Sequence, residues 1–132
     1  MDRFTGRIAA AVVGLCLAAT AQAQVVISQV YGGGGNSGAT LKSDFIELRN
    51  NGASAVSVDG WSVQYASAAG STWARTNLSG SIAPGAYYLV KQADGAGGSL
   101  ALPPPDATGT IAMAGTNGKV ALVQSISALS GT

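Results

Sequence analysis

The chain has 132 residues, of which 47% are hydrophobic and 10% are charged, and its formal net charge is +1. This length accommodates a single domain, and 19 glycines do not suit a helical bundle, because glycine disfavours helix interiors. The sequence contains no histidine, which excludes a Ser-His-Asp triad, a histidine-ligated metal and a histidine general base.

Residues 1–23 have the organisation of a secretory signal peptide. Arg3 and Arg7 precede an apolar stretch over residues 8–19, and Ala21-Gln22-Ala23 is a small-x-small cleavage site. The apolar stretch is too short to cross a bilayer, which needs about 20 residues. We therefore predict cleavage after Ala23, a secreted chain in the periplasm or the extracellular medium, and no stable membrane anchor.

The single cysteine, Cys16, lies inside this predicted signal. The alternatives to a cleaved signal are a retained anchor and a lipoprotein lipidated at Cys16, but Leu15 stands where such sites prefer a small residue. A chain that begins at Gln24 has no thiol, so we expect neither a disulfide nor thiolate chemistry in it.

A glycine-rich stretch, Gly32–Gly38, follows the first predicted strand, Val25–Tyr31. It fits a dinucleotide-binding G-x-G-x-x-G pattern and nearly fits a phosphate-binding P-loop, in which Ala39 would replace the essential lysine. Both motifs require a helix to follow, because its N-terminal amides hold the phosphate. The next predicted element is a strand that begins within a few residues, so we predict a long flexible loop instead of a nucleotide site.

The stretch Ser43–Asn51 predicts a strand with two distinct faces. Ile46 and Leu48 alternate with polar or aromatic neighbours, and this period of two is typical of a strand with one buried face. The other face carries Phe45, Glu47 and Arg49. Asn50-Asn51-Gly52 then has turn chemistry, because asparagine and glycine tolerate positive φ.

A second alternating stretch covers Val56–Tyr65 and is interrupted by a corner at Asp59-Gly60. Trp61, Val63 and Tyr65 share one face, whereas Ser62 and Gln64 lie on the other. We expect the apolar face to be buried and Trp61 to anchor the core, since large aromatic side chains dominate core energetics.

The rest of the chain predicts four more short strands and the turns between them. Ala83-Pro84-Gly85-Ala86 is a turn, Asn117-Gly118 is a hairpin signal, and Pro103-Pro104-Pro105 is an extended, exposed connector. Seven or so short strands fit an all-β, immunoglobulin-like β-sandwich. The four strands are expected at Thr72–Leu78, Tyr87–Lys91, Thr108–Ala114 and Lys119–Gln124.

The order of these pieces resembles the lamin tail domain family. The family's core strand and Gly-Trp corner correspond to Asp44–Asn50 and Asp59–Trp61, and flanking matches are Val26–Tyr31 and Ile82–Val90. Gln29 departs from the pattern, because the family often has glutamate there. The resemblance covers about residues 25–123 and implies an immunoglobulin-like sandwich with an accessory role and no catalytic residue. The glycine run before the Asp-Phe-Ile-Glu strand also resembles a bacterial secreted subgroup in which this domain precedes an extracellular endonuclease/exonuclease/phosphatase-type nuclease.

Few residues outside the predicted signal can carry chemistry. Asp44 and Glu47 are three apart on a strand and point to opposite faces, so they do not form an acid/base pair, and Glu47 is expected to make an ion pair or hydrogen bonds across the sheet. We predict no catalytic, cofactor-binding or metal-binding residue, although a loop calcium site at Asp94 is an alternative. The carboxylates of residues 24–132 are Asp44, Glu47, Asp59, Asp94 and Asp106.

Five basic residues balance these five carboxylates, so residues 24–132 have zero net charge. The basic residues are scattered along the chain, and we predict no nucleic-acid binding by this domain, which would need a basic face. A carbohydrate platform of aromatic side chains is an alternative to their burial in the core. The basic residues are Lys42, Arg49, Arg75, Lys91 and Lys119; the aromatic candidates are Tyr31, Trp61, Tyr65, Trp73, Tyr87 and Tyr88.

These observations favour a secreted, noncatalytic sandwich module over residues 25–124 that binds, positions or adheres. The alternative is the N-terminal part of a secreted nuclease whose catalytic domain would be covalently linked. Residues 125–132 are interpreted as a C-terminal tail or a truncated linker, because they contain no further apolar alternation. A closing strand would then be missing, so we expect self-association through the exposed edge of the strand at Val120–Val123. The partner of the binding module would be an unknown extracellular ligand.

Overall fold

A computed structural model of the chain describes residues 24–132, and the predicted signal segment with Arg3, Arg7 and Cys16 lies outside them. The described residues form strands and turns without a helix, so none of them provides an apolar helix long enough to cross a membrane. The strands are β1 (Val25–Tyr31), β2 (Ser43–Asn50), β3 (Val56–Ser57), β4 (Ser62–Ala66), β5 (Ala74–Asn77), β6 (Ser81–Ile82), β7 (Tyr87–Asp94), β8 (Ala107–Thr108) and β9 (Lys119–Val123).

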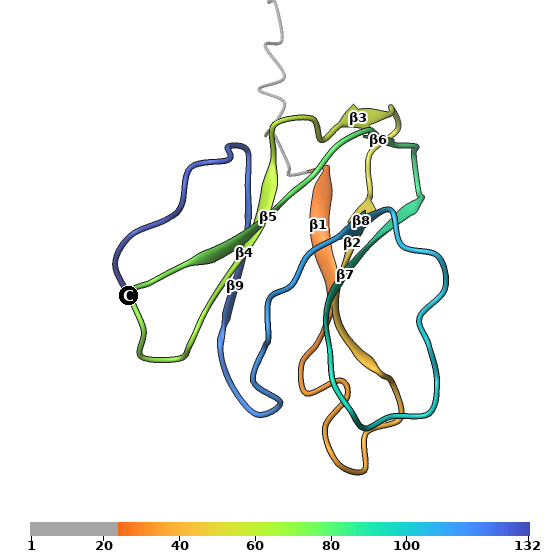
Figure 1. Cartoon of the computed structure of the whole chain (residues 1–132). Helices are drawn as coiled ribbons and strands as arrows, with labels where there is room; N and C mark the ends of the chain where they lie inside the picture. Colours follow the sequence, from red (N-terminus) through yellow and green to blue (C-terminus); the bar gives the residue numbers. More distant parts are fainter. Residues whose placement is uncertain (1–23) are drawn as a thin grey trace, which may run out of the picture.

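Two sheets pack against each other, and a short β3–β6 pair lies at one end (Figure 1). The larger sheet has the order β1-β2-β7-β8, and the smaller has the order β5-β4-β9. All pairings are antiparallel except β7–β8, which is parallel. This arrangement confirms the predicted all-β, immunoglobulin-like sandwich.

The core lies between the sheets and is built on the apolar face of β2. Ile46 and Leu48 are fully buried and pair in register with Val90 and Tyr88 of β7. Val63 of β4 is also fully buried and faces them from the other sheet. Each such aliphatic side chain stabilises the fold by about 1.5–3 kcal/mol relative to exposure. The predicted faces of β2 and the burial of Val63 are therefore confirmed.

The corner before β4 forms as predicted, but its tryptophan is not fully buried. Gly60 has a φ of 74°, a left-handed conformation that glycine adopts without strain. Trp61 packs against the core as a half-buried neighbour, whereas Val58 before the corner is completely buried. Trp61 is therefore a partly buried neighbour of the core and not its central anchor, because the chain turns at Gly60 and the first fully buried apolar position after the turn is Val63, three residues later.

Both faces of β4 are covered, which corrects the expectation that only the face of Trp61, Val63 and Tyr65 is buried. The side chains of Ser62 and Gln64 are fully buried. The C-terminal tail, residues 125–132, returns along the smaller sheet (dark blue in Figure 1). The Gln64 amide donates to the carbonyl of Ser127 at 2.8 Å and accepts from the amide of Leu129 at 2.9 Å. These bonds satisfy backbone groups of the tail that have no ladder partner.

The strand expected at Thr108–Ala114 is largely wrong, because only Ala107–Thr108 pairs as β8. Beyond it, backbone bonds continue only in part, and side chains take the amides of Ile111 and Met113. The amide of Ala93 donates to the Ile111 carbonyl at 3.1 Å, whereas the amide of Ile111 donates to Gln92 Oε1 at 3.1 Å and that of Met113 donates to Asp44 Oδ2 at 2.7 Å. The predicted Asn117-Gly118 hairpin is also wrong. The strand after it, β9, pairs with β4 in the other sheet, so this segment crosses between sheets.

The glycine-rich loop after β1 is packed, which corrects the prediction of a flexible loop. Gly34 and Gly35 are buried, and a Cβ at Gly34 would collide with the carbonyl group of Ser43. The amide of Gly35 donates to the Leu41 carbonyl at 2.7 Å, and the amide of Gly97 donates to the Gly35 carbonyl at 2.7 Å. Glycine is needed here because backbone packs directly on backbone.

One turn prediction and one connector prediction agree with the structure. The turn at Ala83–Ala86 is closed by a bond from the amide of Ala86 to the carbonyl of Ala83 at 3.0 Å, with Gly85 at a φ of 71°. Pro103–Pro105 is exposed and outside every strand. The strand at Tyr87 is longer than expected and ends at Asp94, which places that carboxylate at the end of β7 beside the start of β2.

Candidate functional site

The five carboxylates of residues 24–132 are all engaged in hydrogen bonds that hold the fold together. Asp44 is almost fully buried and accepts from the amides of Gly34 at 2.6 Å and Met113 at 2.7 Å. A buried charge needs such partners, because isolated it is very costly. Asp44 therefore ties the glycine-rich loop to the crossover between the sheets.

The other carboxylates lie in separate places. Glu47 accepts from the Ser28 hydroxyl at 2.8 Å, which confirms the expected hydrogen bond across the sheet. Asp59 accepts from the amide of Gly80 at 2.8 Å, and Asp106 accepts from the amide of Leu89 at 2.7 Å. Within the described part of the chain, no group of three or more His, Cys, Asp or Glu residues lies close enough together to hold a metal ion. Glu47, Asp59 and Asp106 therefore each bond to a group of the fold itself.

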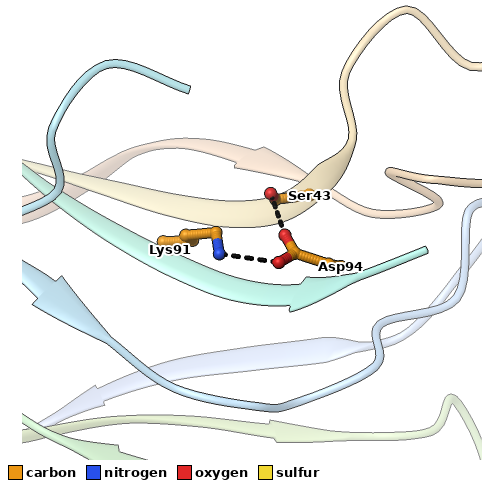
Figure 2. Close-up of polar contacts among 3 residues, drawn as sticks. All are labelled: Ser43, Lys91 and Asp94. Atoms are coloured by element: carbon orange, nitrogen blue, oxygen red, sulfur yellow. Dashed lines mark hydrogen bonds and ion pairs between the residues drawn. The ribbon is translucent and has the colours of Figure 1, made fainter. Parts of the chain in front are cut away.

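Asp94 lies in a more open setting, where two strands of the larger sheet meet (Figure 2). Ser43 of β2 donates its hydroxyl to Oδ1, and Lys91 of β7 donates its ammonium to Oδ2 at 2.9 Å. The Ser43 hydroxyl, followed by the Lys91 ammonium, lowers the pKa of Asp94 below its ordinary value of 3.8. Hydrogen bonds to the charged form stabilise it, so Asp94 is ionised at neutral pH.

A cleft of about 560 Å³ opens beside this triad. Its lining includes Lys42, Ser43, Lys91 and Asp94, called here the floor, and the proline segment Pro103–Pro105, called here the wall. The volume falls within the range of roughly 300–1,000 Å³ that is typical of ligand sites. The cleft combines a charged floor with an apolar wall, and it is the candidate binding site of the domain.

A second, smaller hollow lies between the edges of the two sheets. It has a volume of about 200 Å³ and is lined by Val30 of β1, Val120 of β9, Tyr65 and Met113, among others. Val30 is 46% exposed although its register partner, Ile46, is fully buried. The sandwich is therefore less well filled along this side.

The aromatic side chains do not form the platform considered for a carbohydrate. Tyr31 stacks on Phe45 with ring centroids 5.5 Å apart, on the outer face of the larger sheet. Arg49 lies over the ring of Tyr87 at 5.2 Å, and on the other sheet Lys119 lies over Trp73 at 5.4 Å. The structure separates these rings, and two of them are partly covered by cations.

Sequence reasoning did not identify Lys42, Ser43 and Lys91 as members of one site. Asp94 was considered only as a loop calcium ligand, yet it lies on β7 with its oxygens occupied by a hydroxyl and an ammonium. The only signal was the length of the strand after Tyr87. The end of this strand, Lys91-Gln92-Ala93-Asp94, has no apolar alternation that would predict a strand, so only its pairing with β2 brings Ser43 and Asp94 together.

Comparison with known proteins gives one family match. The family model described as Lamin Tail Domain matches residues 18–128, which is most of the chain. A search among curated proteins found no match.

Proposed function

The chain belongs to the lamin tail domain family, and on that premise we propose that it is a secreted, noncatalytic binding or positioning module. The family's immunoglobulin-like sandwich supports a noncatalytic β-module. The secreted location rests on the signal-like residues 1–23, whose Arg3, apolar stretch and Ala21-Gln22-Ala23 site favour export. The ligand-binding role rests on the cleft beside Asp94.

The use of the carboxylates is the observation that carries the noncatalytic assignment. Each of the five accepts a hydrogen bond from a backbone amide, a hydroxyl or an ammonium of the domain itself. A general acid/base pair or a metal cluster needs groups that converge on one reacting atom. Three of them lie on the larger sheet and the other two, Asp59 and Asp106, lie in loops, which favours recognition by shape and charge over turnover.

A turnover assay tests the noncatalytic assignment. The purified chain is incubated with plasmid DNA and with a chromogenic phosphate ester, each with magnesium and with manganese. We expect no hydrolysis. Activity that copurifies with the protein through two columns and disappears in Glu47→Ala would overturn the proposal.

Export is tested separately by fractionation of cells that produce the full chain. We expect the protein in the periplasm or medium, with an N-terminal sequence that begins at Gln24. A full-length protein that keeps Met1 and sediments with membranes would contradict the export proposal and favour the retained anchor.

A second candidate function is that the domain is the N-terminal part of a secreted nuclease. The glycine run Gly32–Gly35 ahead of Asp44–Glu47 favours it, because this order resembles the bacterial subgroup in which the domain precedes a nuclease. The partner would then be a covalently linked catalytic domain. Reading the coding sequence beyond Thr132 decides between the two candidates, since an open reading frame with a nuclease domain would establish the second.

A further inference from the structure

We propose that the cleft between Lys42 and Pro103–Pro105 binds a peptide segment that presents an acidic side chain beside an aromatic one. The inference rests on the proposed binding function and specifies its site and the chemistry of its partner. Two features carry it: a surplus of positive charge on the floor of the cleft and the preformed apolar wall that lines the same cleft.

The floor of the cleft has a net positive charge. Lys42 and Lys91 contribute two ammonium groups, and Asp94 contributes one carboxylate, so the formal sum is +1. Lys91–Asp94 is the only ion pair within residues 24–132. Both oxygens of Asp94 are already engaged, Oδ1 by Ser43 and Oδ2 by Lys91. The exposed Lys42 ammonium is therefore the group that an incoming carboxylate would meet.

The wall is apolar and offers no hydrogen-bond donor along the prolines. Pro103, Pro104 and Pro105 are all exposed, and proline has no backbone N–H. Exposed extended proline segments are recognised by aromatic side chains that lie against the rings. An aromatic ring on the ligand is thus the natural partner of this wall.

The wall is held at both ends, so it does not have to form on binding. Before it, the amide of Lys42 donates to the carbonyl of Leu100 at 2.9 Å. After it, Asp106 and Leu89 exchange two bonds: the Asp106 amide donates to the Leu89 carbonyl at 2.9 Å, and the Leu89 amide donates to Asp106 Oδ2 at 2.7 Å. A preorganised wall lowers the entropic cost of binding.

A peptide fits these features better than an acidic polysaccharide. Sugar rings pack on aromatic faces, and no aromatic residue is among those that line the cleft. Its volume of about 560 Å³ lies within the range for sites that bury small ligands, which suits a unit of two side chains. The carboxylate would meet Lys42 while the aromatic ring covers the prolines.

The test is a titration of the isotope-labelled chain, followed by NMR, with acetyl-Phe-Asp-amide as the probe. We expect saturable shifts of the amides of Lys42, Ser43, Lys91 and Gly95. The neutral probe acetyl-Phe-Asn-amide should bind at least about threefold more weakly, because it lacks one exposed charge pair. Acetyl-Ala-Asp-amide should also bind more weakly, because it lacks the ring.

Variants separate a binding role from a structural one. Lys42→Ala should weaken binding of acetyl-Phe-Asp-amide, whereas Arg75→Ala, which removes an exposed cation from β5 of the other sheet, should not. Pro104→Ala should weaken binding by removing one ring of the wall. Asp94→Asn should strengthen it, since the carboxylate repels an acidic ligand and a merely structural role predicts no gain.

Three outcomes overturn the inference: no binding at about 10 mM probe, well beyond the weakest specific affinities; equal affinity for the neutral probe; or tighter binding of trigalacturonate than of the peptide. None of them bears on the noncatalytic assignment, which fails only through turnover in the plasmid and phosphate-ester assays. The two proposals therefore fail by different measurements.

Discussion

The carboxylate of Asp44 accepts a hydrogen bond at 2.7 Å from the amide of Met113, which lies 69 residues later in the chain. The same carboxylate accepts from the amide of Gly34 at 2.6 Å. One buried side chain therefore joins the loop after β1 to the segment that crosses between the two sheets.

Asp44→Asn should destabilise the domain markedly. An asparagine in the same place turns an NH₂ group toward one of two backbone donors, and the loss is expected to be about 2–3 kcal/mol, because hydrogen bonds to buried charged groups are the strong ones. Urea unfolding of both proteins measures it. Asp59→Asn serves as the control, since Asp59 is exposed and accepts one bond from Gly80; a similar loss in both variants would contradict the special role of Asp44.

Gln64→Ala should release the C-terminal tail from β4. The variant loses the acceptor for the Leu129 amide and the donor to the Ser127 carbonyl, at an expected cost of about 1–3 kcal/mol for two hydrogen bonds of about 0.5–1.5 kcal/mol each. Hydrogen exchange at the Leu129 amide should accelerate more than exchange in β2. Unchanged protection of Leu129 would show that the tail is held by other contacts, such as the bond from Trp73 Nε1 to the Gly131 carbonyl at 3.0 Å.

Asp94 should make stability depend on pH at the acid end. Its pKa is lowered in the folded state by Ser43 and Lys91, so its stabilising contribution is present above the ordinary value of 3.8 and is lost as the pH falls through the lower folded pKa. Asp94→Asn should therefore lower the melting temperature at neutral pH but not at about pH 2, well below the ordinary pKa of aspartate. A melting-temperature difference that is the same at both pH values would refute the linkage.

Tyr88 should make the stability of the domain depend on pH at the alkaline end. Burial raises the pKa of this phenol above its ordinary value of 10.0, and its hydroxyl donates to the carbonyl of Ser79 at 2.7 Å. The contribution is fully present below the unfolded pKa and is lost as the pH rises through the folded pKa. Tyr88→Phe should lose stability near neutral pH and show a shallower alkaline decline, which thermal melts between about pH 8 and pH 11 resolve, on either side of the ordinary tyrosine value. An equally steep decline in the variant would assign the alkaline transition to another group.

The isolated chain should also self-associate through an exposed strand edge, at β1 or β9. These strands are outermost in their sheets, β1 has no charged residue, and the one cation of β9, Lys119, donates to the Gly70 carbonyl at 2.6 Å. A strand edge without charged residues can form hydrogen bonds with a strand of another molecule. Sedimentation over a concentration series up to about 100 μM, a range in which exposed edges associate, should show oligomers; a monomer throughout would contradict the prediction.

Local pattern was sufficient wherever one strand or one turn determines its own conformation. The alternation of Ile46 and Leu48 predicted the buried face of β2, and Pro84-Gly85 predicted the turn before β7, because side chains alternate across a strand and glycine accepts positive φ. The proline segment was likewise predicted to stay outside the sheets. In each case the physical cause acts within a few residues of its effect.

Tertiary structure alone decided which distant groups satisfy one another. Gln64 falls on the polar face of its predicted strand, yet the tail buries it, and residues 109–114 appear as a strand, yet Gln92 and Asp44 take the amides of Ile111 and Met113. The cleft also depends on this, since Ser43 and Asp94 are 51 residues apart and meet only through the pairing of β2 with β7. A hydrogen-bond donor at the surface and one beneath a folded tail have the same local sequence pattern, and only packing determines which of them loses water and requires a protein partner.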